Sequence, residues 1–195
     1  MTLGYTLRRS LTTLGTVRRS TLGTIERLGA VSKRVLVGYA TGTGSTTGVA
    51  EAIGSALGER GYGVDVRPLG QVDSPAGYNA CVIGSAVNAG AWLPAATDWM
   101  RAHAKALRTV PVAVFCVHGM NGGPDAKQTR KRLAYLDPVR AVLTPTGEGY
   151  FLGTGPTRAD TGPLARWMFR TFGGTADGDS RDWAAIHDWA AGVAL

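Results

Sequence analysis

The feature that most constrains the fold is a short apolar run that opens directly into a turn rich in glycine and threonine. Residues Arg34–Ala40 read RVLVGYA, which favours a buried β-strand, and TGTGSTTG follows at residues 41–48. Apolar residues then recur at helical spacing from Val49 to Leu57, and GERGYG ends the pattern. A strand, a tight turn and a helix in this order are typical of the first unit of a parallel α/β sheet.

The rest of the chain alternates in the same way. Further strands are expected at Val64–Leu69, Asn79–Val87, Pro111–Gly119 and Gly149–Thr154, with Ala141–Thr144 as an alternative to the last. Further helices are expected from Pro94 to Leu107, over Asp125–Tyr135, over residues 162–172 and within Ser180–Leu195. Five strands joined mostly by helices predict an α/β fold with a doubly wound, five-stranded parallel sheet, which binds ligands beyond the carboxyl ends of its strands.

The turn after the first strand has the chemistry of a phosphate site. Backbone N–H groups, a helix N-terminus and several hydroxyls converge there, and together they favour a phosphate dianion. The residues concerned are Thr41, Gly42, Thr43, Gly44, Ser45, Thr46 and Thr47. The turn has no lysine, which argues against a Walker-type site, and Thr47 stands where a G-x-G-x-x-G motif has its third glycine. A terminal monophosphate fits better than a triphosphate.

The pattern T-x-T-G-x-T, formed by Thr41, Thr43, Gly44 and Thr46, resembles the phosphate loop of the flavodoxin family over roughly residues 34–191. The resemblance implies FMN as the cofactor and the strand order 2-1-3-4-5. It also implies that the loops after strands three and four hold the flavin ring. The residues at those places are Ser85, Ala86, Val87, Asn88, Ala89, Gly90, Trp92, His118, Gly119 and Met120.

Two of these side chains have competing interpretations. Trp92 either stacks on the flavin or packs in the core. His118 either acts on the ring, as a hydrogen-bond partner or a proton relay and so as the one catalytic candidate, or is an ordinary loop histidine.

Within the flavodoxins, the chain resembles the menaquinone-dependent protoporphyrinogen oxidase group. The likeness rests on IGSAVNAG at residues 83–90, on His103 and on the tail GGTADGDSRDW at residues 173–183. The segment Phe151–Asp160 and the loop from His118 onward depart from that group, and these regions shape access of a substrate.

Charge separates the chain into two parts, a basic arm of residues 1–32 and a domain of residues 33–195. Residues 1–34 hold seven basic side chains and one acidic, a net charge of +6, out of +7 for the whole chain. The 161 residues after Arg34 hold 14 basic and 13 acidic side chains. The basic character therefore belongs to the arm and does not indicate a nucleic-acid-binding domain. No cluster of His, Cys and carboxylate residues has metal-ligand spacing, so no metal site is expected.

The arm, which is expected to be disordered, repeats one short phrase three times: TLGYTLRRS, TLGTVRRS and TLGTIERLG. The phrase resembles the cargo-loading peptide of encapsulin nanocompartments, which implies an encapsulin shell protein as the partner of residues 2–28. The residues expected to enter shell pockets are Leu3, Gly4, Leu7, Leu14, Gly15, Val17, Leu22, Gly23 and Ile25. Tandem copies would strengthen capture through effective concentration. A basic tail that adsorbs to an anionic membrane, and a tail with no dedicated partner, are the alternatives.

The chain is expected to stay in the cytoplasm, inside an encapsulin compartment. Cys81 and Cys116 lie in apolar runs, as buried thiols of intracellular proteins do. No stretch of 18 apolar residues spans a membrane, and the N-terminus lacks the apolar core of a secretory signal.

Overall fold

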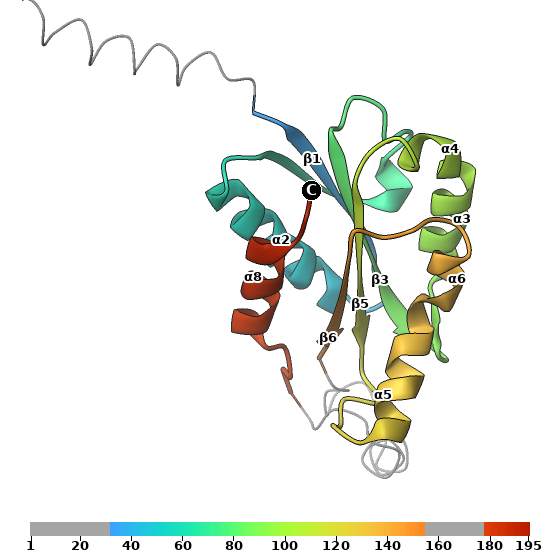
Figure 1. Ribbon diagram of the computed structural model, residues 1–195. Coiled ribbons are helices and arrows are strands. Elements are labelled where there is room, and N and C mark those ends of the chain that lie inside the picture. The colour runs from blue at the N-terminus through green and yellow to red at the C-terminus, as the bar shows by residue number, and fades with distance from the viewer. Residues whose placement is uncertain (1–31, 155–177) are drawn as a thin grey trace, which may run out of the picture. The chain divides into compact units, whose positions relative to one another are not determined.

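The computed structural model describes residues 32–154 and 178–195, which form a parallel sheet covered by helices on both faces (Figure 1). Five parallel strands are ordered β2-β1-β3-β5-β6 across the sheet. The strands are β1 (Arg34–Ala40), β2 (Gly63–Pro68), β3 (Ala80–Asn88), β5 (Val112–His118) and β6 (Gly147–Leu152). This arrangement confirms the doubly wound sheet and the order 2-1-3-4-5. A sixth strand, β4 (Ala91–Trp92), pairs antiparallel with the end of β3 and was not expected.

Helices of different lengths cover the two faces. On one face lie α2 (Ser45–Glu59) and α8 (Trp183–Gly192). On the other lie α3 (Pro94–Ala102), α4 (Ala104–Leu107), α5 (Ala126–Leu133) and α6 (Asp137–Arg140), with the 3₁₀ turns η1 (Leu69–Gln71) and η2 (Ala134–Leu136).

Side chains of the strands alternate between two core clusters, one on each face of the sheet. In β1, Val35 and Val37 pack with α2 and α8, whereas Leu36 packs with α3 on the other side, and all three are fully buried. All seven residues of β5 are buried, as the unbroken apolar run predicts for a strand covered on both faces. The core therefore holds the strands in fixed register, so their carboxyl ends meet along one edge.

Several expected elements are shifted or broken. The helix expected from Pro94 to Leu107 breaks at His103, whose φ of −104° and ψ of 11° are not helical and whose ring centroid lies 4.6 Å from that of Trp99. The helix expected over Asp125–Tyr135 ends at Leu133 and continues as η2. The last strand is β6, so the alternative strand Ala141–Thr144 is wrong.

Two of the expected features lie outside the described residues, and the expected terminal helix is present. The helix expected over 162–172 falls in the undescribed range, as does the arm up to residue 31. The terminal helix is α8, in which Ile186 is buried and Trp183 is 44% exposed.

Candidate functional site

The turn between β1 and α2 is folded by its own side chains. The Gly44 N–H donates to Thr41 Oγ1 at 2.9 Å, and Gly44 has a φ of +90°, a left-handed conformation that a side chain would strain. The turn residues Gly42, Thr43 and Gly44 are exposed, while Ser45 and Thr47 are half-buried. The first turn of α2 is therefore presented to solvent by a fixed loop.

Thr46, in the first turn of α2, is notable for its buried hydroxyl. Its side chain is fully buried, and Oγ1 has no hydrogen-bond partner within residues 32–154 and 178–195. Leaving a buried hydroxyl unpaired costs about 1–3 kcal/mol, and the first amides of α2 also lack partners inside the helix. The positive end of the helix dipole also favours an anion at this position. The loop can therefore hold an anion such as a phosphate.

Arg181 is a residue of this region that the sequence did not single out. It comes from the segment before α8 and lies against the first turn of α2, with Nη1 at 3.5 Å from the Ser45 carbonyl. Two hydrogen bonds of 2.7 and 2.6 Å pair its guanidinium with Asp179 and hold the pKa of that exposed carboxyl below its usual value. Only the contact in space with α2 reveals Arg181, because no motif links residues 136 positions apart.

The second expected loop is a tight hairpin between β3 and β4. Ala89 has a φ of +50° and Gly90 a φ of +83°, as the two central residues of a type I′ turn have. Ser85 is buried and holds the hairpin: its hydroxyl donates to the Ala86 carbonyl at 2.8 Å and accepts from the Leu93 N–H at 3.0 Å. The exposed turn Asn88–Gly90 is thus a rigid feature next to the end of β3.

Trp92, expected either to stack on a flavin or to pack in the core, is 4% exposed and packs in the core cluster on the α3 face. Its indole N–H has no partner in the described part of the chain. Its burial shows the packing role, whereas stacking on a flavin stays a prediction.

His118 ends β5 and is almost entirely buried, at 3% exposure. Its Nδ1 lies 2.7 Å from the Met120 carbonyl, which can only accept, so Nδ1 carries the proton. Nε2 is then an acceptor, and it has no partner among the described residues. Burial, with a smaller contribution from the nearby Arg132, lowers the pKa of His118 to about 4, so the ring is neutral at pH 7.

The loop after His118 is braced by α5 and η2. Arg132 Nη1 donates to the Asn121 carbonyl at 2.7 Å, and the Gly123 N–H donates to Gln128 Oε1 at 2.7 Å. The Asn121 side-chain amide donates to the Tyr135 hydroxyl at 2.6 Å. These contacts hold Asn121 at a φ of +61°. The sequence had not indicated a role in this loop for Gly123, Gln128 or Tyr135.

These loops meet at one edge of the sheet. Ala40 pairs with Ser85 in the sheet register, and Ser85 pairs with Cys116, two residues before His118. The Gly153 N–H donates to the His118 carbonyl at 2.9 Å, and a β-carbon on Gly153 would contact the Ser45 hydroxyl. The structure therefore brings the phosphate turn and the ends of β3 and β5 together. The arm residues 2–28 lie outside the described residues.

A cavity of about 330 Å³ lies elsewhere, near the amino ends of β5 and β6. Arg108 and Arg140 line it, and both already bind groups of the protein: Arg108 the Val142 carbonyl, Arg140 the Glu148 carboxylate. We therefore place the candidate site at the carboxyl edge. Within the described residues, no group of three His, Cys, Asp or Glu side chains could hold a metal ion, and no helix is long and apolar enough to cross a membrane.

A doubly wound sheet with a hydroxyl-rich phosphate turn at its first βα junction defines a mononucleotide-binding protein of the flavin type. The chain belongs to the flavodoxin domain family, which matches residues 36–150. Its cofactor is FMN, and it is an electron-transfer flavoprotein in which the flavin supplies the redox chemistry. The residues fit this group, since a single phosphate would satisfy the orphaned Thr46 hydroxyl and the α2 amides.

Several solved structures are similar to this chain. A short-chain flavodoxin associated with a bacterial microcompartment matches with a TM-score of 0.51 and 15% identity, covering 83% of this chain and 96% of that one. Megasphaera elsdenii flavodoxin matches with a TM-score of 0.47 and 16% identity, covering 80% and 98%. Rubredoxin oxygen:oxidoreductase from Desulfovibrio gigas gives 0.48 and 14%, covering 89% of this chain, which spans 38% of that protein. The search of curated proteins finds no match.

Proposed function

We propose that this chain is an FMN-dependent electron-transfer protein or oxidoreductase that is loaded into an encapsulin shell through its N-terminal repeats. In the domain, the turn Thr41–Thr47 binds the FMN phosphate. The loops Ser85–Gly90 and His118–Met120 hold the polar edge of the flavin ring. The observation that carries the cofactor part is the buried, unpartnered hydroxyl at the start of α2.

The phosphate role of Thr46 gives a specific prediction. We expect Thr46→Val to weaken FMN binding by about 10- to 100-fold, because a hydrogen bond to a charged group contributes roughly 1.5–3 kcal/mol. Riboflavin, which lacks the phosphate, should bind wild type and variant equally, as titration of the flavin fluorescence would show. The FMN-free variant should be at least as stable as wild type, because valine leaves no unpaired hydroxyl. Equal losses for FMN and riboflavin would instead indicate a damaged fold.

The shell-loading part rests on the three repeats and on the basic charge that the arm holds. Among the described residues the core clusters begin at Val35, and the part of the chain after Arg34 is close to neutral. Apolar residues around a glycine, followed by arginines, would dock as extended segments, and copy number would add avidity. Association of a flavodoxin with a protein compartment has a parallel in the microcompartment flavodoxin, whose fold this chain shares. Inside a shell, the flavin would reduce stored ferric iron or a co-packaged partner.

Co-expression with an encapsulin shell protein tests the loading. We expect the full chain to co-purify with assembled shells and a form lacking residues 2–32 to fall to background. A matched variant replaces the apolar anchors Leu3, Leu7, Leu14, Val17, Leu22 and Ile25 by serine and keeps every arginine. Its loss from shells would show that the repeats act by shape and not by charge alone. Equal recovery of the full and truncated chains contradicts loading, whatever the flavin content of the domain.

The second candidate is a membrane-associated, quinone-linked enzyme of the protoporphyrinogen oxidase type. The sequence IGSAVNAG at residues 83–90, which resembles that group, favours it. Of its other supports, His103 has a structural role, since its ring packs against Trp99 where α3 ends. Oxidation of protoporphyrinogen with menaquinone, together with flotation of the protein on anionic liposomes, would favour this function over loading.

A further inference from the structure

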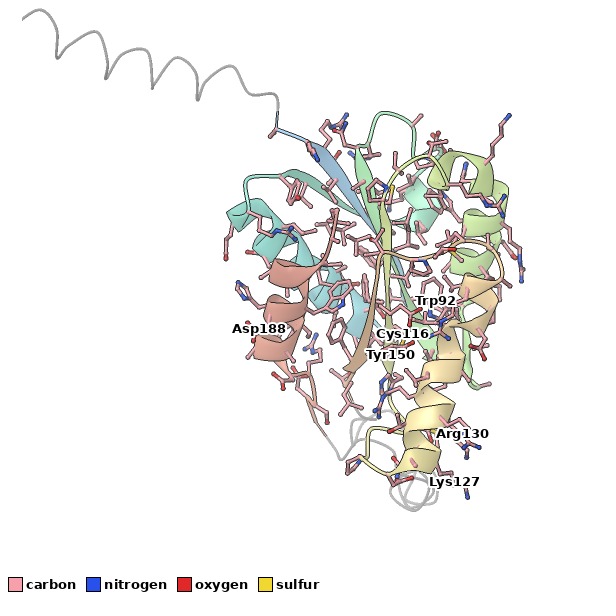
Figure 2. All side chains as sticks on the ribbon, in the orientation of Figure 1. Trp92, Cys116, Lys127, Arg130, Tyr150 and Asp188 are labelled. Atoms are coloured by element: carbon pink, nitrogen blue, oxygen red, sulfur yellow. The ribbon has the colours of Figure 1, made fainter. Side chains whose placement is uncertain are left out.

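Helix α5 differs from the other long helices in having no buried residue. Its sequence AKQTRKRL carries four basic side chains in eight residues, of which Lys127, Arg130 and Lys131 are exposed. Figure 2 shows Lys127 and Arg130 pointing away from the sheet, at the end of the molecule where β5 leads into α5. In a domain with nearly balanced charge, this helix concentrates positive charge on one outer surface.

The same helix also fixes a cofactor loop. Arg132 and Gln128 on its inner side hold the loop after His118 through the Asn121 and Gly123 backbone. Asp125 caps the helix by accepting from the Gln128 N–H at 2.9 Å, which sets where α5 begins. The exposed cations therefore stand on the element that positions one side of the flavin site.

None of the three exposed cations is engaged within the described parts of the chain. There, the ion pairs of arginine involve Arg34, Arg101, Arg140 and Arg181, and no carboxylate lies within 4.0 Å of Lys127, Arg130 or Lys131. Three exposed side chains that form no ion pair among the described residues, but share a face and a charge, are suited to attract an anionic partner.

We propose that Lys127, Arg130 and Lys131 form the docking surface for an acidic redox protein that exchanges electrons with the flavin. An acidic protein fits better than a lipid surface, because Leu133, at 44% exposure, is the only large apolar side chain that α5 exposes. Interfacial helices need a broad apolar face, which this helix lacks. The inference rests on the electron-transfer function and not on shell loading.

Charge reversal on full-length, FMN-loaded protein tests the proposal. The probes are a small acidic [2Fe–2S] ferredoxin, whose reduced cluster gives one electron to the flavin, and basic cytochrome c, whose ferric haem takes one electron from reduced flavin. For Lys127→Glu/Lys131→Glu, we expect the bimolecular rate with ferredoxin at low salt to fall by about ten-fold or more. The rate with cytochrome c should rise. Both differences should shrink at about 1 M salt, where the Debye length is about 3 Å.

The matched control is Lys33→Glu/Lys105→Glu, which makes the same charge change at exposed lysines near the amino ends of β1 and β5. Its rates should stay within about two-fold of wild type. If both double variants changed the rates equally, net charge and not a docking surface on α5 would explain the effect, and the proposal would be wrong. Unchanged ferredoxin rates in Lys127→Glu/Lys131→Glu would also overturn the proposal. The same holds if that variant keeps its ferredoxin rate but loses binding to phosphatidylserine vesicles. Each variant's flavin absorbance is measured first, so a colourless wild type would count against the cofactor assignment and not against α5.

Discussion

The free energy of unfolding is expected to fall by about 3 kcal/mol between pH 7 and pH 4 through His118 alone. Above pH 6.5 the imidazole is neutral in the folded and the unfolded chain, and it contributes no pH dependence. Below pH 6.5 His118 binds a proton in the unfolded chain but not in the folded chain, where its pKa is lowered to about 4. Each pH unit in this window then removes about 1.4 kcal/mol, and the loss ends near pH 4.

Urea unfolding of wild type and His118→Asn at several pH values isolates this contribution. Asparagine keeps a donor for the Met120 carbonyl but does not titrate, so its stability relative to wild type should rise by about 3 kcal/mol from pH 7 to pH 4. Carboxylates with lowered pKa, such as those of Asp65 and Glu148, also weaken the fold in acid, but they do so in both proteins. A constant difference between the two proteins would show that His118 is not held neutral by burial.

The strands and their order could be predicted because burial on two faces leaves a direct mark on sequence. The apolar runs at Arg34–Ala40 and Pro111–Gly119 became β1 and β5 with ends within a residue or two. The turn at residues 41–47 could also be predicted, because glycine permits the backbone conformation of a tight turn and hydroxyl side chains bond to nearby backbone groups. Local rules therefore recovered the sheet and the turn at its first strand–helix junction.

What escaped prediction depends on contacts between distant residues or on very short elements. β4 has two residues and no periodicity, and only its type I′ turn at Ala89 and Gly90 marks it, with alanine where asparagine is usual. Arg181 reaches α2 from the far end of the chain. Arg132 lies on a basic helix with no buried residue, yet its side chain reaches the loop carbonyls of Asn121 and Gly123, which the sequence of the helix does not show.

Replacement of Gly84 by alanine is expected to destabilise the protein by about 3 kcal/mol, at the upper end of the range for overpacked cores. A β-carbon at this position would overlap the Phe115 ring, which lies against the glycine from the paired strand β5. Phe115 is fully buried, and its ring is 6.3 Å from that of Phe151 and 6.4 Å from that of Trp189, so it cannot move without displacing both. Thermal or urea unfolding measures the loss.

The consequences of Gly84→Ala should extend to the cofactor, because β3 and β5 lead directly into two of the proposed flavin loops. We expect weaker FMN binding together with lower stability, and partial recovery of both in Gly84→Ala/Phe115→Leu, where the smaller side chain makes room. Gly58→Ala in α2 is the matched control: its β-carbon meets no atom within 4 Å, so the change should stabilise the helix by about 0.5–1 kcal/mol. If Gly84→Ala were as harmless as this control, the close contact between β3 and β5 would not govern the site. If its stability recovered with Phe115→Leu but FMN affinity did not, the β3 loop would depend on Gly84 for more than space.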